Sequence, residues 1–168
     1  SLDYPGYPFG TVLPFSLTPD GWPLLLISHL AKHTRNLLAA PQCSLTLSEP
    51  GTGDLQQRMR LTLLAKALPL APYDDALAER HFRYFPESRD YYQQLNFRFF
   101  SLRPERVYCV AGFAAARWMG VDRLRARNPF SLPEETAALK RLETAFGERL
   151  YQPLDSRFRL RPANEEPL

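Results

Sequence analysis

Sixteen prolines in a chain of 168 residues limit what this sequence can fold into. Proline has no backbone N–H and a fixed φ angle, so it ends helices and cannot donate a hydrogen bond from a central strand. We therefore expect short helices and strands that are separated by turns. Aromatic residues make up 12% of the chain, and because aromatic side chains favour strands, the core is expected to be rich in β-structure.

The composition also excludes several classes of protein. Two cysteines, Cys43 and Cys109, are too few for a disulfide-stabilised scaffold, and both fit small buried apolar side chains better than nucleophiles. No apolar run reaches the roughly 18 residues of a membrane-spanning helix, and the first residues do not have the pattern of a signal peptide. A net charge of +3 is too weak to indicate nucleic-acid binding. We expect a single cytoplasmic domain that binds neither nucleic acid nor a membrane.

Alternating and β-branched segments predict an antiparallel sheet of six to seven strands. A turn at Asp20-Gly21 joins a first strand, residues 10–17, to a buried apolar strand, residues 23–28, and together they predict a hairpin. Further strands are predicted at residues 42–48, 59–70, 97–102, 105–111 and 113–121. Helices are predicted at residues 34–40, at 72–84, from about residue 86, and at 132–150. The expected fold is mainly β (α+β), a small antiparallel barrel with peripheral helices.

The chain has three histidines, and none belongs to an evident catalytic or metal-binding motif. His29 and His33 are four residues apart, which suits a metal pair on a helix. No third ligand is evident, however, and the neighbouring cations Lys32 and Arg35 oppose a metal ion, so we expect no metal site. His81 is expected to be a solvent-exposed residue of a helix.

A stretch of polar residues at 28–36 follows the predicted buried strand and begins a helix. It brings hydroxyl, amide, imidazole and cationic side chains to a helix N-terminus, where free N–H groups favour phosphate. Arg35 can bind a phosphate through two hydrogen bonds, and Ser28 and Thr34 can donate from their hydroxyls. The stretch fits an ordinary helix cap with a solvated basic turn equally well.

A second cluster, at residues 111–118, combines a run of small residues with Arg117 and Trp118. Small side chains let another backbone or a flat ligand approach closely. A tightly packed strand pair or a dimer interface explains the same residues. Arg58 and Arg60, on an earlier strand, add further cations, and a solvent-facing strand also accounts for them.

Four segments occur in an order that is typical of one protein family. They are residues 7–12 (YPFGTV), 26–37 (LISHLAKHTRNL), 60–63 (RLTL) and 112–118 (GFAAARW). With these segments the chain resembles the pyridoxamine 5′-phosphate oxidase-like FMN-binding split β-barrels. It resembles most their haem-utilisation branch, which carries a similar Ser-x-Leu-x-x-His-Thr-x-Asn-Leu stretch. The resemblance implies a homodimer of split barrels, with a barrel at about residues 7–121 and a C-terminal helix and tail at 132–168.

The resemblance also implies two FMN sites at the dimer interface, and hence an FMN-dependent oxidoreductase that acts on a small-molecule substrate. The flavin carries the redox chemistry in such proteins, so no catalytic acid or nucleophile of the chain is required. The implied cofactor-binding residues are Gly10, Thr11, Val12, Ser28, His33, Thr34, Arg35, Asn36, Arg60, Gly112, Phe113, Arg117 and Trp118.

Two other functions fit the same fold. One is a haem-binding or haem-degrading protein, and the other is a flavin-binding module without catalysis. The resemblance implies that haem-degrading relatives obtain an iron-binding histidine from an additional C-terminal domain, whereas no histidine follows His81 here. Iron ligation of that kind is therefore not expected in this chain, and a haem that used His29 or His33 would compete with FMN.

Overall fold

The computed structural model describes residues 1–52, 54–71, 75–111, 115–124, 126 and 128–147. Ser1–Pro129 forms one compact unit and Phe130–Leu168 forms a second. The elements of the first unit are β1 (Ser16–Leu17), β2 (Pro23–Ser28), α1 (Lys32–Ala39), β3 (Gln42–Ser48), η1 (Leu55–Gln57), β4 (Met59–Pro69), α2 (Asp75–Tyr84), α3 (Ser88–Gln94), β5 (Phe97–Ala111), β6 (Ala116–Met119) and η2 (Val121–Arg123). The second unit contains α4 (Leu132–Phe146).

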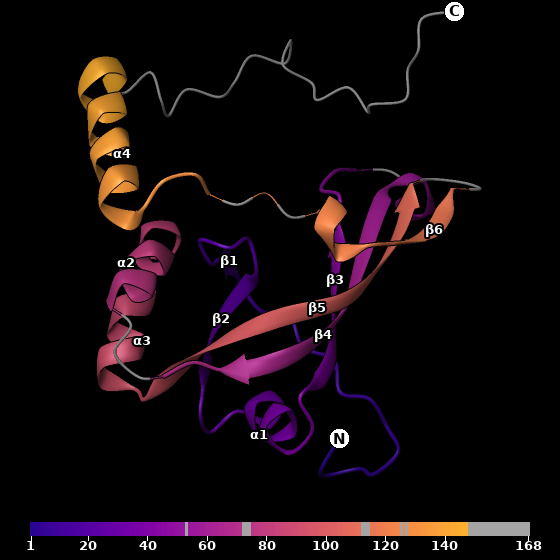
Figure 1. Ribbon diagram of the computed structural model, residues 1–168. Coiled ribbons are helices and arrows are strands. Elements are labelled where there is room, and N and C mark those ends of the chain that lie inside the picture. The colour runs from indigo at the N-terminus through magenta and orange to yellow at the C-terminus, as the bar shows by residue number, and fades with distance from the viewer. Residues whose placement is uncertain (53, 72–74, 112–114, 125, 127, 148–168) are drawn as a thin grey trace, which may run out of the picture. The chain divides into compact units, whose positions relative to one another are not determined.

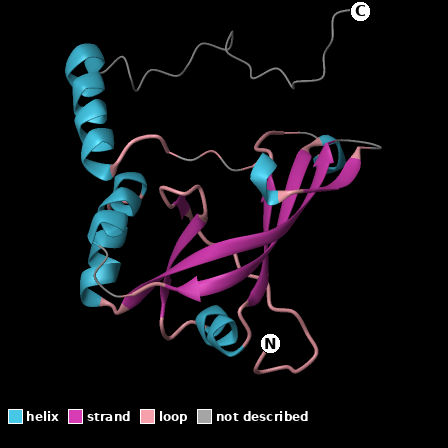
Figure 2. Cartoon of the chain, viewed as in Figure 1, coloured by secondary structure: helices cyan, strands magenta, loops and turns pink. Residues whose placement is uncertain are grey.

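Within the described residues the strands form one six-stranded sheet (Figure 1). Its order is β1-β2-β5-β4-β3, β6 also pairs with β5, and every pairing is antiparallel. Within the first unit, the short helices α1, α2 and α3 lie at the periphery of the strands (Figure 2). The predicted mainly β, antiparallel split-barrel fold with peripheral helices is confirmed.

The longest strand, β5, corrects one sequence prediction. We expected two strands, 97–102 and 105–111, on either side of Pro104, whereas the structure has one continuous strand. Its register with β4 shifts at this point: Ala65 pairs with Pro104 and Leu64 pairs with Arg106. Glu105, between Pro104 and Arg106, therefore bulges out of the ladder. A bulge is one of the places where a sheet tolerates proline. The proline therefore bends the strand rather than ending it.

The first strand is shorter than predicted. The turn is confirmed, because Gly21 adopts a φ of 81° and its N–H donates to the Thr18 carbonyl oxygen at 2.8 Å. The expected strand at residues 10–17, however, is reduced to β1, which pairs with β2 over two residues. Pro14 has no N–H to donate and Val12 is 98% exposed. The segment before β1 is held by the packing of Leu13 and Phe15 against the apolar cluster rather than by strand hydrogen bonds.

Two apolar clusters pack on opposite faces of β2, because successive side chains of a strand point to alternate sides of the sheet. The cluster on the α2 side contains Leu24, Leu26, Leu77, Ala78, Phe82 and Phe99. The cluster on the other side contains Leu25, Ile27, Ala65, Ala67, Phe100 and Leu102, with Leu37 of α1 packed against it. The helices α1 and α2 therefore cover opposite faces of β2 (Figure 1).

His81 contradicts the sequence prediction of an exposed residue, because its side chain is only 2% exposed. The ring lies within 5.1 Å of the Phe85 ring and 5.2 Å of the Phe99 ring, measured between centroids. Its Nδ1 and the Ser16 hydroxyl share a hydrogen bond of 2.8 Å. Burial disfavours the charged imidazolium and lowers the pKa of His81 to about 4. A neutral imidazole therefore connects β1 to α2.

The remaining elements are close to their predicted positions. β2 and β3 match residue for residue, and β4 ends one residue early. α1 begins two residues earlier than predicted, and the Thr34 hydroxyl donates to the Ser28 carbonyl oxygen in the preceding turn. α4 begins with a capping box in which Glu134 accepts from the backbone N–H of Ser131 at 2.8 Å. The predicted strand at 113–121 is shorter at its end, since β6 stops at Met119 and Val121 begins η2. Its predicted start at residue 113 and the helix start at residue 72 lie outside the described residues.

In the part of the chain that the structure describes, no helix combines the length and apolar character needed to span a membrane.

The buried state of His81 predicts how stability depends on pH. The unfolded chain binds a proton near the usual pKa of 6.5, whereas the folded chain binds it only near pH 4. At pH values between these two, the unfolded state binds more protons than the folded state. The free energy of unfolding should therefore decrease as the pH is lowered through this range, by up to about 3 kcal/mol. Urea unfolding of the wild type and of His81→Gln measures the effect. The variant should lose most of this pH dependence, and an unchanged pH dependence in it would show that other groups cause the loss.

Candidate functional site

A pocket of about 270 Å³ lies at the end of β2, where the segment before β1, the start of α1 and the α2–α3 corner come together. Its lining residues are Leu13, Pro14, Leu26, Ile27, Ser28, His33, His81, Phe85, Glu87, Ser88, Tyr91 and Phe97. Seven of these twelve residues are apolar or aromatic, and the five polar ones include two imidazoles and the Glu87 carboxylate. An apolar pocket with a small number of polar groups is typical of a small-molecule site.

The turn that begins the 28–36 stretch is built by its own hydroxyl groups. The Thr34 hydroxyl donates to the Ser28 carbonyl oxygen at 2.6 Å, and the Thr34 side chain is only 1% exposed. The Ser28 hydroxyl accepts from the Leu30 N–H at 3.2 Å. These bonds fix where α1 begins relative to β2. The predicted phosphate-binding role of both hydroxyls stays a prediction.

Residues near the N-terminus of the chain lie against the other polar groups of this stretch. The Asp3 carboxylate forms an ion pair with Lys32 at 2.9 Å, and this partner lowers the pKa of Asp3. The Asn36 side-chain oxygen accepts from the Leu2 N–H at 2.9 Å. Arg35, by contrast, is exposed, so its guanidinium is accessible to a ligand from solvent.

His33 carries a buried nitrogen that has no hydrogen-bond partner. Its Nε2 is shielded from solvent and pairs with no group among the described residues. Leaving such a group unpaired costs about 1–3 kcal/mol, so a native structure usually supplies a partner from protein, water or ligand. Burial also lowers the pKa of His33, which favours the neutral imidazole. The ring is therefore an available electron-pair donor at the edge of the pocket.

His29 lies nearby but does not line the pocket. Its Nδ1 donates to the backbone carbonyl oxygen of Asn96 at 3.2 Å, and the side chain is half-buried. Asn96 itself has a φ of 52° and connects α3 to β5. This bond holds the His29 ring against the sheet edge.

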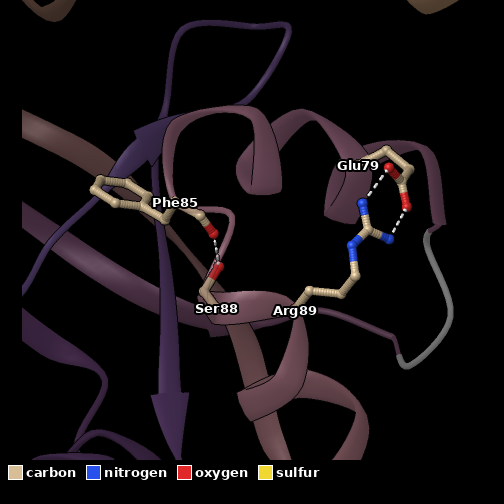
Figure 3. Close-up of polar contacts among 4 residues, drawn as sticks. All are labelled: Glu79, Phe85, Ser88 and Arg89. Carbon is tan, nitrogen blue, oxygen red and sulfur yellow. Dashed lines mark hydrogen bonds and ion pairs between the residues drawn. The ribbon is translucent and has the colours of Figure 1, made fainter.

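The outer wall of the pocket is a corner between α2 and α3 that is held by two polar contacts (Figure 3). The Arg89 guanidinium binds both carboxylate oxygens of Glu79, at 2.6 and 2.8 Å. The Ser88 hydroxyl donates to the Phe85 carbonyl oxygen at 2.5 Å. Arg89 also lies over the Phe82 ring, 4.7 Å from its centroid. These contacts fix the positions of the wall residues in the pocket.

The predicted strand residues lie far from the pocket along the sheet. Arg60 pairs with Val110, whereas Ser28 pairs with Phe97 at the other end of β5. These two positions are thirteen residues apart (97 to 110), about 40 Å along a strand. One chain therefore does not bring Arg60 to the residues of the 28–36 stretch.

Arg60 and Trp118 do share one face of the sheet. Trp118 pairs with Tyr108, and their rings lie 5.0 Å apart between centroids. Trp118 is 57% exposed. Arg117, one residue earlier, is on the opposite side of the strand. We call Arg60, Tyr108 and Trp118 the sheet-face group.

The remaining predicted residues divide in two. Gly10, Thr11 and Val12 are exposed and do not line the pocket, while Gly112 and Phe113 lie outside the described residues. Sequence reasoning missed the pocket wall, above all His81. The helical spacing of Leu77, His81 and Phe85 was the signal that could have found it, since it places the imidazole on the buried face of α2.

Neither metal nor thiol chemistry has an evident place in the described residues. No group of three or more His, Cys, Asp or Glu side chains there is arranged to hold a metal ion. The Cys43 thiol donates to the Ala65 carbonyl oxygen at 3.6 Å, and burial raises its pKa. A protonated, half-buried thiol is a poor nucleophile.

Three comparisons place the chain among known proteins. The family model described as "CREG, beta-barrel" matches residues 1–123. The chain is 34% identical over 119 residues to the non-canonical heme oxygenase HOZ, chloroplastic, of Arabidopsis thaliana, and the match covers 69% of this chain and 36% of that protein. It is 34% identical over 131 residues to heme oxygenase HutZ of Vibrio cholerae, covering 74% of this chain and 73% of that protein.

A solved structure described as a heme binding protein from Mycobacterium smegmatis is also similar. Its TM-score is 0.63 at 26% sequence identity, and the match covers 71% of this chain and 50% of that one. The chain thus spans about a third of the length of the Arabidopsis relative and half of this structural neighbour.

The hydrogen bond that forms the turn makes a stability prediction. Thr34→Val keeps the shape of the side chain but removes the donor to the Ser28 carbonyl oxygen. We expect it to lower the free energy of unfolding by about 1–2 kcal/mol, since a buried bond is lost. Thr34→Ser keeps the donor and is the matched control. Urea unfolding measures both variants, and a Thr34→Val variant as stable as the wild type would show that the bond contributes nothing.

Proposed function

The chain belongs to the CREG β-barrel family, which confirms its resemblance to the haem-utilisation branch of the split barrels, and from this membership we propose that it binds haem. The names of its relatives support haem over the FMN-dependent oxidoreductase that the sequence first predicted. Haem binding is the alternative that the sequence also offered beside the FMN-dependent oxidoreductase, and we prefer it here.

The observation that carries the proposal is the pair of uncharged imidazoles in an apolar pocket. Haem is a large, flat, mainly apolar ring whose iron takes an axial ligand from the protein, often histidine. A histidine binds iron only as the neutral imidazole, and burial favours that form at both His33 and His81. The residues present therefore fit the chemistry of the group.

The size of the pocket limits how much of the haem one chain can enclose. At about 270 Å³ it is slightly smaller than the roughly 300–1,000 Å³ of pockets that enclose drug-sized ligands, and haem is larger than such ligands. The pocket thus has room for part of the porphyrin. The rest must lie against another surface.

We propose that this other surface is the sheet-face group of a second copy of the chain. The exposed Trp118 ring and the half-buried Tyr108 ring offer aromatic surface to a flat ring, and the Arg60 guanidinium suits a propionate carboxylate. These residues lie at the opposite end of β5 from the pocket. In a dimer with twofold symmetry, the pocket of each chain can face the sheet-face group of the other, which creates two equal sites. The distance between the pocket and the sheet-face group within one chain is therefore compatible with a shared site.

When bound, haem would supply a redox-active iron, on which the oxidative chemistry of haem oxygenases depends. The contribution of this chain is to bind and orient the ring. Its apolar lining excludes water from one side, and the corner between α2 and α3 holds that lining in place.

Titration with haemin tests the proposed function. We expect the wild-type protein to develop a Soret band that saturates at one haem per chain, with a dissociation constant in the micromolar range or below. The same titration in the presence of FMN compares the two ligands directly. A protein that binds FMN tightly and develops no saturable Soret band would contradict haem binding and restore the flavoprotein interpretation.

A mixed dimer tests whether the site is shared. One chain carries Ser28→Trp, which fills its pocket, and the other carries Arg60→Ala with Trp118→Ala. If sites are shared, one of the two sites combines both defects and the other is intact, so the mixed dimer should bind haem at half the wild-type stoichiometry. If each chain forms its own site from its pocket alone, the homodimer that carries Arg60→Ala with Trp118→Ala in both chains should bind haem like the wild type, whereas a shared site predicts that this homodimer loses binding. Ser28→Ala is the control for the first substitution, and a monomeric wild-type protein in sedimentation would also contradict a shared site.

A further inference from the structure

We infer that His33 supplies the axial ligand of the haem iron in this chain, through the Nε2 that has no partner in the structure. The inference rests on the proposed haem function and assigns the iron to one residue. It places the iron ligand at the start of α1, within the first 123 residues that match the family.

His81 is excluded by its surroundings. Its Nδ1 is occupied by the Ser16 hydroxyl at 2.8 Å, and the ring is enclosed by Phe85 and Phe99. Its side chain is almost fully buried in the packing between α2 and the sheet. The ring borders the pocket, but it cannot turn toward an iron without giving up the Ser16 hydrogen bond and its contacts with the two aromatic rings.

His29 is oriented with its Nε2 free for a metal, but its ring lies outside the pocket. A donated Nδ1 hydrogen bond to a backbone carbonyl is common in metal-ligating histidines, because it leaves Nε2 free. The His29 ring, however, does not line the pocket. Iron bound there would leave the porphyrin outside the apolar lining that carries the proposed function.

An axial ligand needs a place in the pocket lining and a free imidazole nitrogen, and His33 has both. The ring borders the pocket, and its Nε2 is the one imidazole nitrogen without a partner that the described residues leave buried. Ligation needs the proton on Nδ1 and a turn of the side chain into the pocket that it already borders. Because His33 is the second residue of α1 and is half-buried, this rotation leaves the hydrogen bonds of the preceding turn intact.

Resonance Raman and absorption spectra of the haem complex test the assignment without any measurement of activity. The wild type, His33→Ala, His29→Ala and His81→Gln are each mixed with haemin, and the reduced complexes are examined for the iron–histidine stretching band. We expect the band in the wild type, in His29→Ala and in His81→Gln, and its loss in His33→Ala with at least a tenfold weaker affinity for haem. Added imidazole should restore the ligated spectrum in His33→Ala, because the substitution leaves space beside the iron.

The outcomes separate this inference from the proposed function. Haem binding that retains the iron–histidine band in His33→Ala, or loses it in His29→Ala, would overturn the assignment and leave haem binding standing. A wild-type complex without the band would do the same. Absence of haem binding in the wild type would overturn both. Circular dichroism checks that each variant is folded, and His33→Gln, which keeps the polar bulk of the side chain, replaces His33→Ala if alanine does not fold.

Discussion

The pairing of β5 with three other strands determines where every functional group of this chain lies. β2 pairs with its first part, β6 with its last part, and β4 runs along most of its length. The pocket at the end of β2 and the sheet-face group near β6 are therefore at opposite ends of one strand. No rearrangement of side chains can bring them together within a chain, since the backbone ladder fixes the distance. A ligand that needs both must be held between two chains.

Burial determines the charge state of two histidines in this structure. Moving a histidine out of water disfavours its charged form, so both His33 and His81 have pKa values below the ordinary one. The two rings use this neutrality differently. His81 connects β1 to α2 through the Ser16 hydroxyl and acts in the core. His33 keeps an unpaired nitrogen beside the pocket, and only such a ring can accept a new partner without breaking an existing one.

The sequence predicted local elements well where a pattern is confined to a few residues. The apolar strand at 23–28 and the alternating strand at 42–48 need no information from elsewhere in the chain, and both match the structure. Predictions failed where a distant partner decides the outcome. Pro104 does not end a strand, because a bulge against β4 accommodates it, and His81 is buried because the aromatic rings of other segments surround it. For the candidate site, Ser28 and His33 of the predicted 28–36 stretch line the pocket, and their role as ligand-binding residues stays a prediction. The α2–α3 wall depends on packing between distant segments, and the separation of Arg60 from the pocket depends on the register of β5.

Native mass spectrometry of the protein mixed with equal amounts of haemin and FMN tests whether two chains share haem sites, because it counts chains and identifies ligands in one measurement. Shared haem sites predict a dimer that carries two haems and no flavin. A dimer that carries FMN in preference to haem, or a monomer that binds haem at full stoichiometry, would contradict it.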